Sequence, residues 1–271
     1  MLKVSGLNVR YKRSKKWILN DISFELNEGD LVIFAGPSGC GKTTLARALI
    51  GLIPHYYESE IDGIIDIFGA NPIEEGPISL AGLVGFVSQD PESYITALTV
   101  EEELAFPLEN LKVNTITIKE RINKVLELLK IQDLRRKPTS ELSAGQLQKV
   151  SIASALSLDP KVLILDEPFA RLDRTSARNL CNILEKLKSS KKIIIIFEHR
   201  LDDIISIADR IYVMEKGQII AEGHPKKIVK YLIDIDIPEL VEVFWELYQE
   251  GKIPELPLSV NEAIEVLRVA K

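Results

Sequence analysis

The chain has 271 residues, of which 46% are hydrophobic and 27% are charged, a composition typical of a soluble globular protein. This length can hold one large α/β domain, alone or with a smaller appendage. The formal net charge is −6 and the sequence contains no basic stripe, so we expect no partner among nucleic acids.

The sequence disfavours two further classes of protein, those held together by disulfides and those that span a membrane. Two cysteines, Cys40 and Cys181, do not make a disulfide framework. No apolar run approaches the length of a membrane span, and residues 1–6 contain no apolar signal region. We therefore expect a cytoplasmic protein that reaches a membrane only through a partner.

The first part of the chain predicts short strands. Residues 2–11 alternate weakly between apolar and polar side chains, which suggests an edge strand. Residues 18–26 predict a second strand, and further strands are predicted at 64–68 and 84–87.

A glycine-rich stretch follows the short apolar run at 31–35 and precedes good helix formers at 45–50. It reads Gly-Pro-Ser-Gly-Cys-Gly-Lys-Thr-Thr, which contains the G-x-x-x-x-G-K-T pattern of a phosphate-binding P-loop. Strand, loop and helix in this order are the context in which the pattern marks a site rather than a glycine-rich turn before an ordinary helix. The residues assigned to nucleotide binding are Gly36, Pro37, Ser38, Gly39, Cys40, Gly41, Lys42, Thr43 and Thr44.

The chemistry of this loop predicts ATP and Mg²⁺ as cofactors. Glycines leave the backbone N–H groups open to an anion, and the positive end of the following helix points at the same place. Lys42 is expected to reach the β- and γ-phosphates, and the Thr43 hydroxyl is expected to ligate Mg²⁺. The same helix N-terminus should favour the thiolate of Cys40.

The middle of the chain is helical, and strand signals then return. The pattern is helical from about 99 to 157, opening with a capping box at Thr99 and Glu102. Strands are predicted at 162–165, 193–197 and 211–214, and the first two are apolar throughout, as parallel strands buried on both faces are. An α/β core with an inserted helical lobe fits this order.

Two acids end the strand at 162–165. Ligands gather beyond the carboxyl ends of strands in a parallel sheet, so Asp166 there can hold Mg²⁺ through its water shell. Glu167, one residue later, can point at an attacking water and act as its base. The simpler alternative is a pair of strand-terminal acids that cap the next element, and the P-loop upstream argues against it.

Residues 142–146 read Leu-Ser-Ala-Gly-Gln and precede a helical run at 147–158. Taken alone, they fit an ordinary serine N-cap followed by a helix. Together with the P-loop and the two acids, they form an ordered set that resembles the ATP-binding cassette (ABC) ATPases, whose motif is usually L-S-G-G-Q. Ala144 replaces a glycine, and the other four residues match.

This resemblance implies an α/β fold with a P-loop NTPase core, an N-terminal antiparallel β portion, an inserted helical lobe and a C-terminal helical extension. The ABC ATPase domain is expected at 1–228 with its lobe at about 92–157, and the extension at 229–271. The resemblance also implies that two cassettes enclose two ATP molecules, each site joining the P-loop of one subunit to the 142–146 motif of the other. The residues assigned to that second half are Ser143, Ala144, Gly145, Gln146 and Asp173.

Three single residues outside these motifs take roles from the resemblance. Gln89 matches the loop glutamine that senses Mg²⁺, water and the membrane partner, and His199 matches the histidine that contacts the γ-phosphate. With Glu167 they make the expected catalytic set. Tyr11 matches the aromatic platform for adenine, and Trp17 is its rival. The simpler alternatives are an exposed strand aromatic at Tyr11 and a surface histidine at a strand end.

Asp173 matches the aspartate of the loop that crosses the interface between two cassettes. It ends the stretch Ala-Arg-Leu-Asp at 170–173, where the family usually has S-A-L-D. Only the last two residues agree firmly, so the stretch departs from the family pattern in its first half.

Three stretches resemble the ATP-binding components of energy-coupling factor transporters, which import vitamins, vitamin precursors and cobalt or nickel ions. They lie at 51–57, at 89–92 followed by 98–106 and Asn110, and at 197–200. The resemblance implies an ATPase that pairs with a second cassette, identical or similar. It also implies docking at the cytoplasmic face of the membrane on an integral coupling subunit, which carries a substrate-binding membrane subunit. The alternatives are the ATPase subunit of an ordinary ABC importer and a soluble ABC ATPase acting on nucleic acid. A different P-loop enzyme, such as a small-molecule kinase, would not explain 142–146.

The tail at 229–271 carries nine acidic and four basic side chains and is too apolar to be a disordered segment. It predicts one helix with an apolar stripe and a second helix opened by Ser259 and Glu262. We expect it to hold a second copy of the chain, with packing on the chain's own core as the alternative. The predicted stripe consists of Leu240, Phe244, Leu247 and Tyr248.

Overall fold

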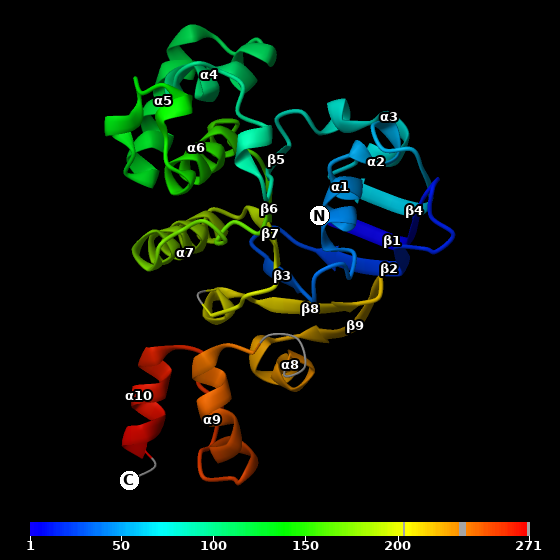
Figure 1. The fold of residues 1–271 in the computed structure, drawn as a ribbon, viewed down its shortest axis with the longest axis vertical. Coiled ribbons are helices and arrows are strands. Elements are labelled where there is room, and N and C mark those ends of the chain that lie inside the picture. The colour runs from blue at the N-terminus through cyan, green and yellow to red at the C-terminus, as the bar shows by residue number, and fades with distance from the viewer. Residues whose placement is uncertain (203, 233–236, 270–271) are drawn as a thin grey trace.

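The computed structural model describes residues 1–202, 204–232 and 237–269. Two sheets and a set of helices make up the described chain (Figure 1). The strands are β1 (Leu2–Tyr11), β2 (Leu19–Leu26), β3 (Leu31–Ala35), β4 (Ser59–Ile67), β5 (Val84–Val87), β6 (Val162–Asp166), β7 (Ile193–Glu198), β8 (Arg210–Glu215) and β9 (Gln218–Gly223). The helices are α1 (Lys42–Leu49), α2 (Leu52–His55), α3 (Pro72–Glu75), α4 (Val100–Asn110), α5 (Thr115–Leu129), α6 (Ala144–Ser157), α7 (Arg174–Ser189), α8 (Pro225–Leu232), α9 (Glu239–Gln249) and α10 (Val260–Val269).

The central sheet positions the site. Its order is β5-β6-β7-β3-β8-β9, with parallel pairing throughout except for antiparallel β9. Every residue of β3, β6 and β7 is buried, because both faces of the sheet are covered. Residues along β3 alternate between the two cores: Val32 and Phe34 join one, and Leu31 and Ile33 join the other. The doubly covered parallel sheet predicted from the apolar runs is therefore confirmed.

The strand register brings the carboxyl ends of the parallel strands to one edge. Ala35 lies opposite Glu198, Asp166 lies opposite Phe197, and Val87 lies opposite Leu165. The residues that follow these strands, among them the P-loop, Glu167, His199 and Gln89, therefore leave the sheet side by side.

The small antiparallel sheet has the order β2-β1-β4, so β1 is its central strand. The prediction of an edge strand at 2–11 is wrong. Its alternation is weak because the pairing shifts near Gly6, between Val4 and Leu7 on one side and between Ser5 and Asn8 on the other. Such irregularities break the period of two by which a strand is recognised.

Two other expectations about strands need correction. β4 begins at Ser59, earlier than the predicted start at Ile64, and passes through Gly63. A Cβ on Gly63 would lie 2.6 Å from the carbonyl oxygen of Gly6, so only glycine allows the two strands to approach there. β9 was not predicted, although it pairs with β8 along its length.

Helices α4, α5 and α6 form the lobe that is drawn in green tones in Figure 1, and α6 contacts both α4 and α5. Thr99 and Glu102 make the predicted capping box at the start of α4. The apolar stripe of α5 faces the lobe interior and consists of the buried residues Ile118, Ile122, Val125, Leu126 and Leu129. The helical interpretation of 99–157 is confirmed.

The tail packs on the chain's own core, and the expected contact with a second copy stays a prediction. The buried side chains of α9, α10 and their connection join the same cluster as the central sheet, and they are Val241, Phe244, Ile253, Leu256, Leu258, Ala263 and Val266. Ser259 caps α10 as predicted, since its hydroxyl accepts from the Glu262 N–H at 3.3 Å. The predicted stripe is correct at Phe244 but wrong at Tyr248, which is exposed. Residues 233–236 and 270–271 of the predicted extension lie outside the described residues.

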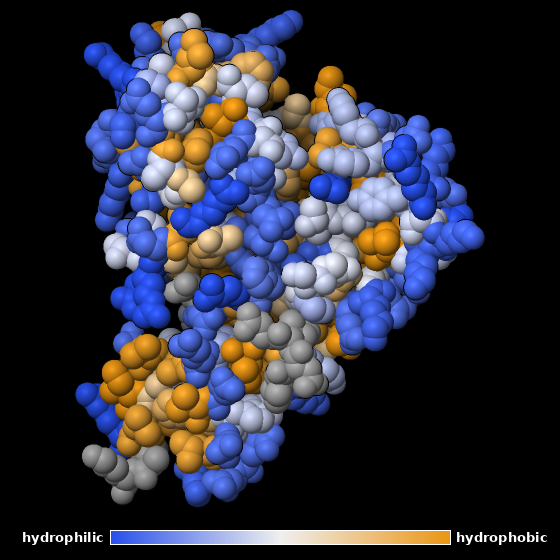
Figure 2. Space-filling view, viewed as in Figure 1, coloured by the Kyte–Doolittle hydropathy of each residue, from blue (hydrophilic) through white to orange (hydrophobic). Residues whose placement is uncertain are grey.

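The described part of the tail carries apolar side chains that are exposed to solvent. Figure 2 shows them as an orange area over α9 and α10. The exposed apolar residues of these two helices include Val243, Val260, Ile264 and Leu267. None of the helices in the described ranges has the length and apolarity needed to cross a bilayer.

Candidate nucleotide site

The P-loop connects β3 to α1 at the shared edge of the sheet. A Cβ on Gly36 would lie 2.3 Å from the carbonyl oxygen of Met214 and 2.7 Å from Cys40 Sγ, so the loop packs too closely there for any side chain. Gly41 has a φ of 114° and directly precedes α1, where the first N–H groups of the helix have no partners within it. The sequence therefore forms a tight turn whose helix end is suited to an anion.

Lys42 is buried and lies within the loop that it belongs to. Its Nζ donates to the carbonyl oxygen of Gly36 at 2.5 Å and to that of Pro37 at 3.3 Å. Neutral carbonyls hold the ammonium group without cancelling its charge, so the charge remains available to phosphate oxygens.

Cys40 is buried beside Lys42, with Sγ 4.0 Å from Nζ. Burial raises the pKa of the Cys40 thiol, and this effect outweighs the lowering by the Lys42 charge. The expectation of a thiolate at the helix N-terminus is therefore wrong, because the loop removes the sulfur from water.

Asp166 ends β6 with its carboxylate almost completely buried. Burial raises the pKa of Asp166 to about 6, and a hydrogen bond from the Thr43 side chain opposes that shift. Its Oδ1 has no hydrogen-bond partner among the described residues. A buried carboxylate oxygen without a partner, next to a threonine hydroxyl, fits Mg²⁺, which prefers oxygen ligands.

Gln89, Glu167 and His199 converge, each from the loop after a different parallel strand. Gln89 Nε2 donates to Glu167 Oε2 at 2.7 Å. His199 Nδ1 lies 3.4 Å from Glu167 Oε1, within reach of an ion pair but without hydrogen-bond geometry. A carboxylate oriented by an amide and an imidazole can accept a proton from water.

The backbone of Glu167 has a φ of 47°, in the left-handed region that costs a non-glycine residue about 1–2 kcal/mol. Its N–H donates to the carbonyl oxygen of Phe197 at 2.9 Å, which holds it in place. Backbone strain of this kind gathers at functional sites, and the carboxylate of this strained residue accepts from Gln89.

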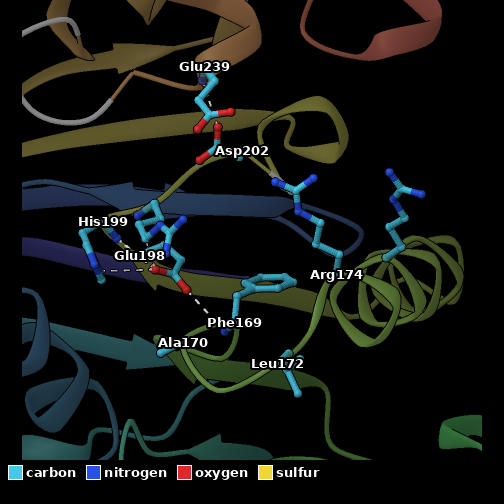
Figure 3. A pocket seen from close by; sticks show the side chains of 10 residues that line it. Phe169, Ala170, Leu172, Arg174, Glu198, His199, Asp202 and Glu239 are labelled. Atoms are coloured by element: carbon cyan, nitrogen blue, oxygen red, sulfur yellow. Dashed lines mark hydrogen bonds and ion pairs between the residues drawn. The ribbon is translucent and has the colours of Figure 1, made fainter. Parts of the chain in front are cut away.

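Glu198 is a residue of the site to which the sequence analysis gave no role. Its buried carboxylate accepts from the N–H of His199 at 3.0 Å and from the N–H of Phe169 at 3.4 Å (Figure 3). Burial raises the pKa of Glu198. It borders a pocket of about 260 Å³ between the loop after β6 and the loop after β7. The signal in the sequence that could have identified Glu198 is an acid at the end of an otherwise apolar strand.

Ser143 and Asp173 lie at exposed helix N-termini. Ser143 caps α6, its hydroxyl accepting from Gln146 N–H while Gln146 Oε1 accepts from Ser143 N–H. Asp173 caps α7 by accepting from Ser176 N–H at 2.8 Å, and these bonds lower the pKa of Asp173. No hydrogen bond or ion pair within the described ranges joins residues 143–146 or 173 to the P-loop of the same chain. Their role at a second cassette stays a prediction.

The two adenine candidates lie in different surroundings. The Tyr11 hydroxyl is 3.3 Å from Thr44 Oγ1, next to the P-loop helix, and its ring meets Tyr57 edge-on. Trp17 is 43% exposed with the guanidinium of Arg10 5.0 Å from its ring centroid. The contact with Thr44 favours Tyr11, and the assignment stays a prediction.

Residues 19–170 match the ABC transporter family. A putative ABC transporter ATP-binding protein of Pyrococcus horikoshii is 36% identical over the whole of this chain and 97% of its own length. The putative HMP/thiamine import ATP-binding protein YkoD of Bacillus subtilis is 38% identical over 85% of this chain, which spans 43% of YkoD. Among solved structures, cbiO1 of Clostridium perfringens, part of the ABC transporter complex cbiONQ, gives a TM-score of 0.75 at 29% identity. That likeness covers 92% of this chain and 96% of cbiO1.

Proposed function

Because the chain belongs to the ABC transporter family and is an ATP-binding ATPase of the kind those proteins contain, we propose that it powers membrane import of a micronutrient through an energy-coupling factor transporter. The micronutrient is a vitamin, a vitamin precursor, or a cobalt or nickel ion. The convergence of Gln89, Glu167 and His199 beside the P-loop carries the hydrolytic part of this proposal. The likeness to YkoD and to cbiO1 supports the import branch.

In the proposed mechanism, the P-loop N–H groups and Lys42 hold the phosphates of ATP. Mg²⁺ would be held by Thr43, Gln89 and Asp166, and when bound it neutralises negative charge on the phosphates. Glu167, oriented by Gln89, takes the proton of the attacking water. His199 faces the same space and contacts the terminal phosphate.

The proposed partner at the ATP site is a second cassette. Ser143, Ala144 and Asp173 are exposed in the single chain. The N-terminus of α6, at Ser143 and Ala144, suits a phosphate from outside. The cassette at 1–228, its lobe at about 92–157 and the extension at 229–271 are the proposed units. The boundary at 228 falls within α8.

The proposed partner at the membrane is a helix of an integral coupling subunit. An apolar groove of about 270 Å³ lies between the P-loop part and the helical lobe, lined by residues such as Leu80, Phe86 and Leu111. Ile78 is 83% exposed close to it. Val84 and Phe86 of β5 line one wall of the groove, and Gln89 follows Phe86 by three positions. A helix bound in the groove therefore contacts the strand that leads to the catalytic set. The site proposed for this docking is the cytoplasmic face of the membrane.

Co-purification tests this proposal. The tagged chain is expressed in its own cells, extracted with its membrane partners in mild detergent and purified, and the bound integral proteins are identified. We expect a coupling subunit and a small substrate-binding membrane protein. Recovery with a soluble solute-binding protein instead would indicate an ordinary ABC importer. Salt-sensitive retention of nucleic acid without membrane proteins would indicate the soluble alternative.

A further inference from the structure

Arg171 joins two loops of the site that are far apart in the sequence. Its Nη2 donates to Asp90 Oδ1 at 3.0 Å, and its Nη1 donates to Glu92 Oε1 at 2.9 Å. Both acids follow Gln89, and Arg171 follows Glu167 by four residues. Each arm of the guanidinium therefore holds the loop after β5 to the loop after β6.

The same two loops are also joined inside the site. Gln89 Nε2 donates to Glu167 Oε2 at 2.7 Å. The loops are thus connected at two points. The bond between Gln89 and Glu167 joins two proposed catalytic residues, whereas the contacts of Arg171 involve no catalytic residue. The geometry of the first connection depends on how the second holds the loop that carries Gln89.

The segment that carries Arg171 is itself fixed on its other sides. The N–H of Phe169 donates to the buried carboxylate of Glu198, next to His199 (Figure 3). A Cβ on Gly145 would lie 3.2 Å from the carbonyl oxygen of Arg171, so the start of α6 also packs on this segment. Arg171 therefore projects from an anchored backbone, and its guanidinium can restrain the more exposed loop at Asp90 and Glu92.

The degree of exposure decides what these ion pairs can do. The side chain of Arg171 is 31% exposed, and those of Asp90 and Glu92 are 50% and 61% exposed. Ion pairs this open to water contribute little to folding stability and weaken in salt. A planar guanidinium that binds two carboxylates does, however, restrict orientation strongly. The contact is therefore suited to positioning a loop rather than to stabilising the fold.

We propose that Arg171 is a positioning residue for ATP hydrolysis. It holds the loop of Gln89 against the loop of Glu167, so that the bond between these two side chains is made in a fixed geometry. The proposal rests on the roles proposed above for Gln89 and Glu167, and not on transport. Because Arg171 acts through Gln89, its loss lowers kcat and leaves the KM for ATP nearly unchanged.

The test uses the purified full chain and steady-state phosphate release. Arg171→Ala introduces the residue that the S-A-L-D pattern usually has at this position. We expect its kcat to fall about three- to tenfold, the size of effect that two half-exposed ion pairs can supply, with KM changed less than about twofold. Arg171→Lys should keep part of the rate, because an ammonium supplies the charge without the fork.

Glu92→Gln is the matched variant, because among the described residues the carboxylate of Glu92 bonds only to Arg171. It should lower kcat less than Arg171→Ala does, and the double variant should be no slower than Arg171→Ala alone. Raising the salt from about 0.1 M to about 1 M shortens the screening length from roughly 10 Å to 3 Å. This should lower the kcat of the wild type toward that of Arg171→Ala, and it should barely change the kcat of Arg171→Ala itself.

Three results would overturn the proposal: a wild-type kcat in Arg171→Ala, effects of Arg171→Ala and Glu92→Gln that simply add, or a loss that appears in KM. Glu167→Gln in the same assay separates this proposal from the proposed function. If Glu167→Gln is inactive while Arg171→Ala is normal, only the positioning role fails. If Glu167→Gln hydrolyses ATP normally, the assignment of the site itself fails.

Discussion

Replacing Glu167 by glutamine removes the proposed base while keeping the shape of the side chain. A glutamine at this position can still offer its carbonyl oxygen to Gln89 Nε2, which now lies 2.7 Å from Glu167 Oε2. The left-handed backbone at φ 47° costs both residues the same. We therefore expect the free energy of unfolding to change by less than about 1 kcal/mol, the net value of one hydrogen bond.

The rate should respond very differently from the stability. Loss of a general base typically costs about 10²–10⁴ in rate. At 1.36 kcal/mol per tenfold change, this corresponds to about 3–5 kcal/mol in the barrier to hydrolysis. ATP affinity should stay close to that of the wild type, because Lys42 and the P-loop backbone are unchanged.

Three measurements on one preparation check this prediction: phosphate release at saturating ATP, a nucleotide titration, and gel filtration with ATP present. The variant should bind ATP, hydrolyse it very slowly and accumulate as an ATP-bound dimer. Glu215→Gln is the control, since Glu215 also ends a strand of the sheet but pairs with Lys216 at the surface. Turnover within about tenfold of the wild type, below the range expected for a lost base, would refute the role of Glu167.

Gly36→Ala should lose ATP affinity and about 1–3 kcal/mol of unfolding free energy, because the added Cβ would clash with the Met214 carbonyl. Thermal unfolding measures the stability and a fluorescent-nucleotide titration measures the affinity. Normal ATP binding would contradict the tight packing of the loop. Lys42→Ala and Ser143→Arg should each be inactive alone but partly active when mixed, since one intact composite site can form; no recovery in mixtures shown to exchange subunits would argue against the shared site. The double variant Ile264→Ser, Leu267→Ser should weaken dimerisation without nucleotide and leave ATP affinity unchanged, because both side chains are about half exposed on the tail. Analytical ultracentrifugation measures the dimer affinity, and equal values for variant and wild type would reject a dimer contact there. A truncation after Ile228 is a poorer test of the same idea, because it removes Leu232 from the core.

The features that depend on near neighbours could be predicted from the sequence by itself. The P-loop is closed by bonds from Lys42 to carbonyls five and six residues away, and the capping boxes at Thr99 and Ser143 span three residues. Apolar runs at β6 and β7 predicted strands buried on both faces, because a strand with one face in water carries polar side chains at alternate positions. Ends of parallel strands share an edge, so the meeting of the P-loop with Asp166 and Glu167 was also foreseeable.

The tertiary structure alone decided which distant segments meet and how far each group is buried from solvent. A period of two tells which face of β1 is buried, but it does not tell whether one strand or two pair with it, and here two do. The pKa of Cys40 is raised by burial in the folded loop, because desolvation outweighs the lowering by the Lys42 charge and by backbone hydrogen bonds. Glu198 and Arg171 find their partners across gaps of 29 and about 80 residues, and nothing in their neighbouring sequence specifies those contacts.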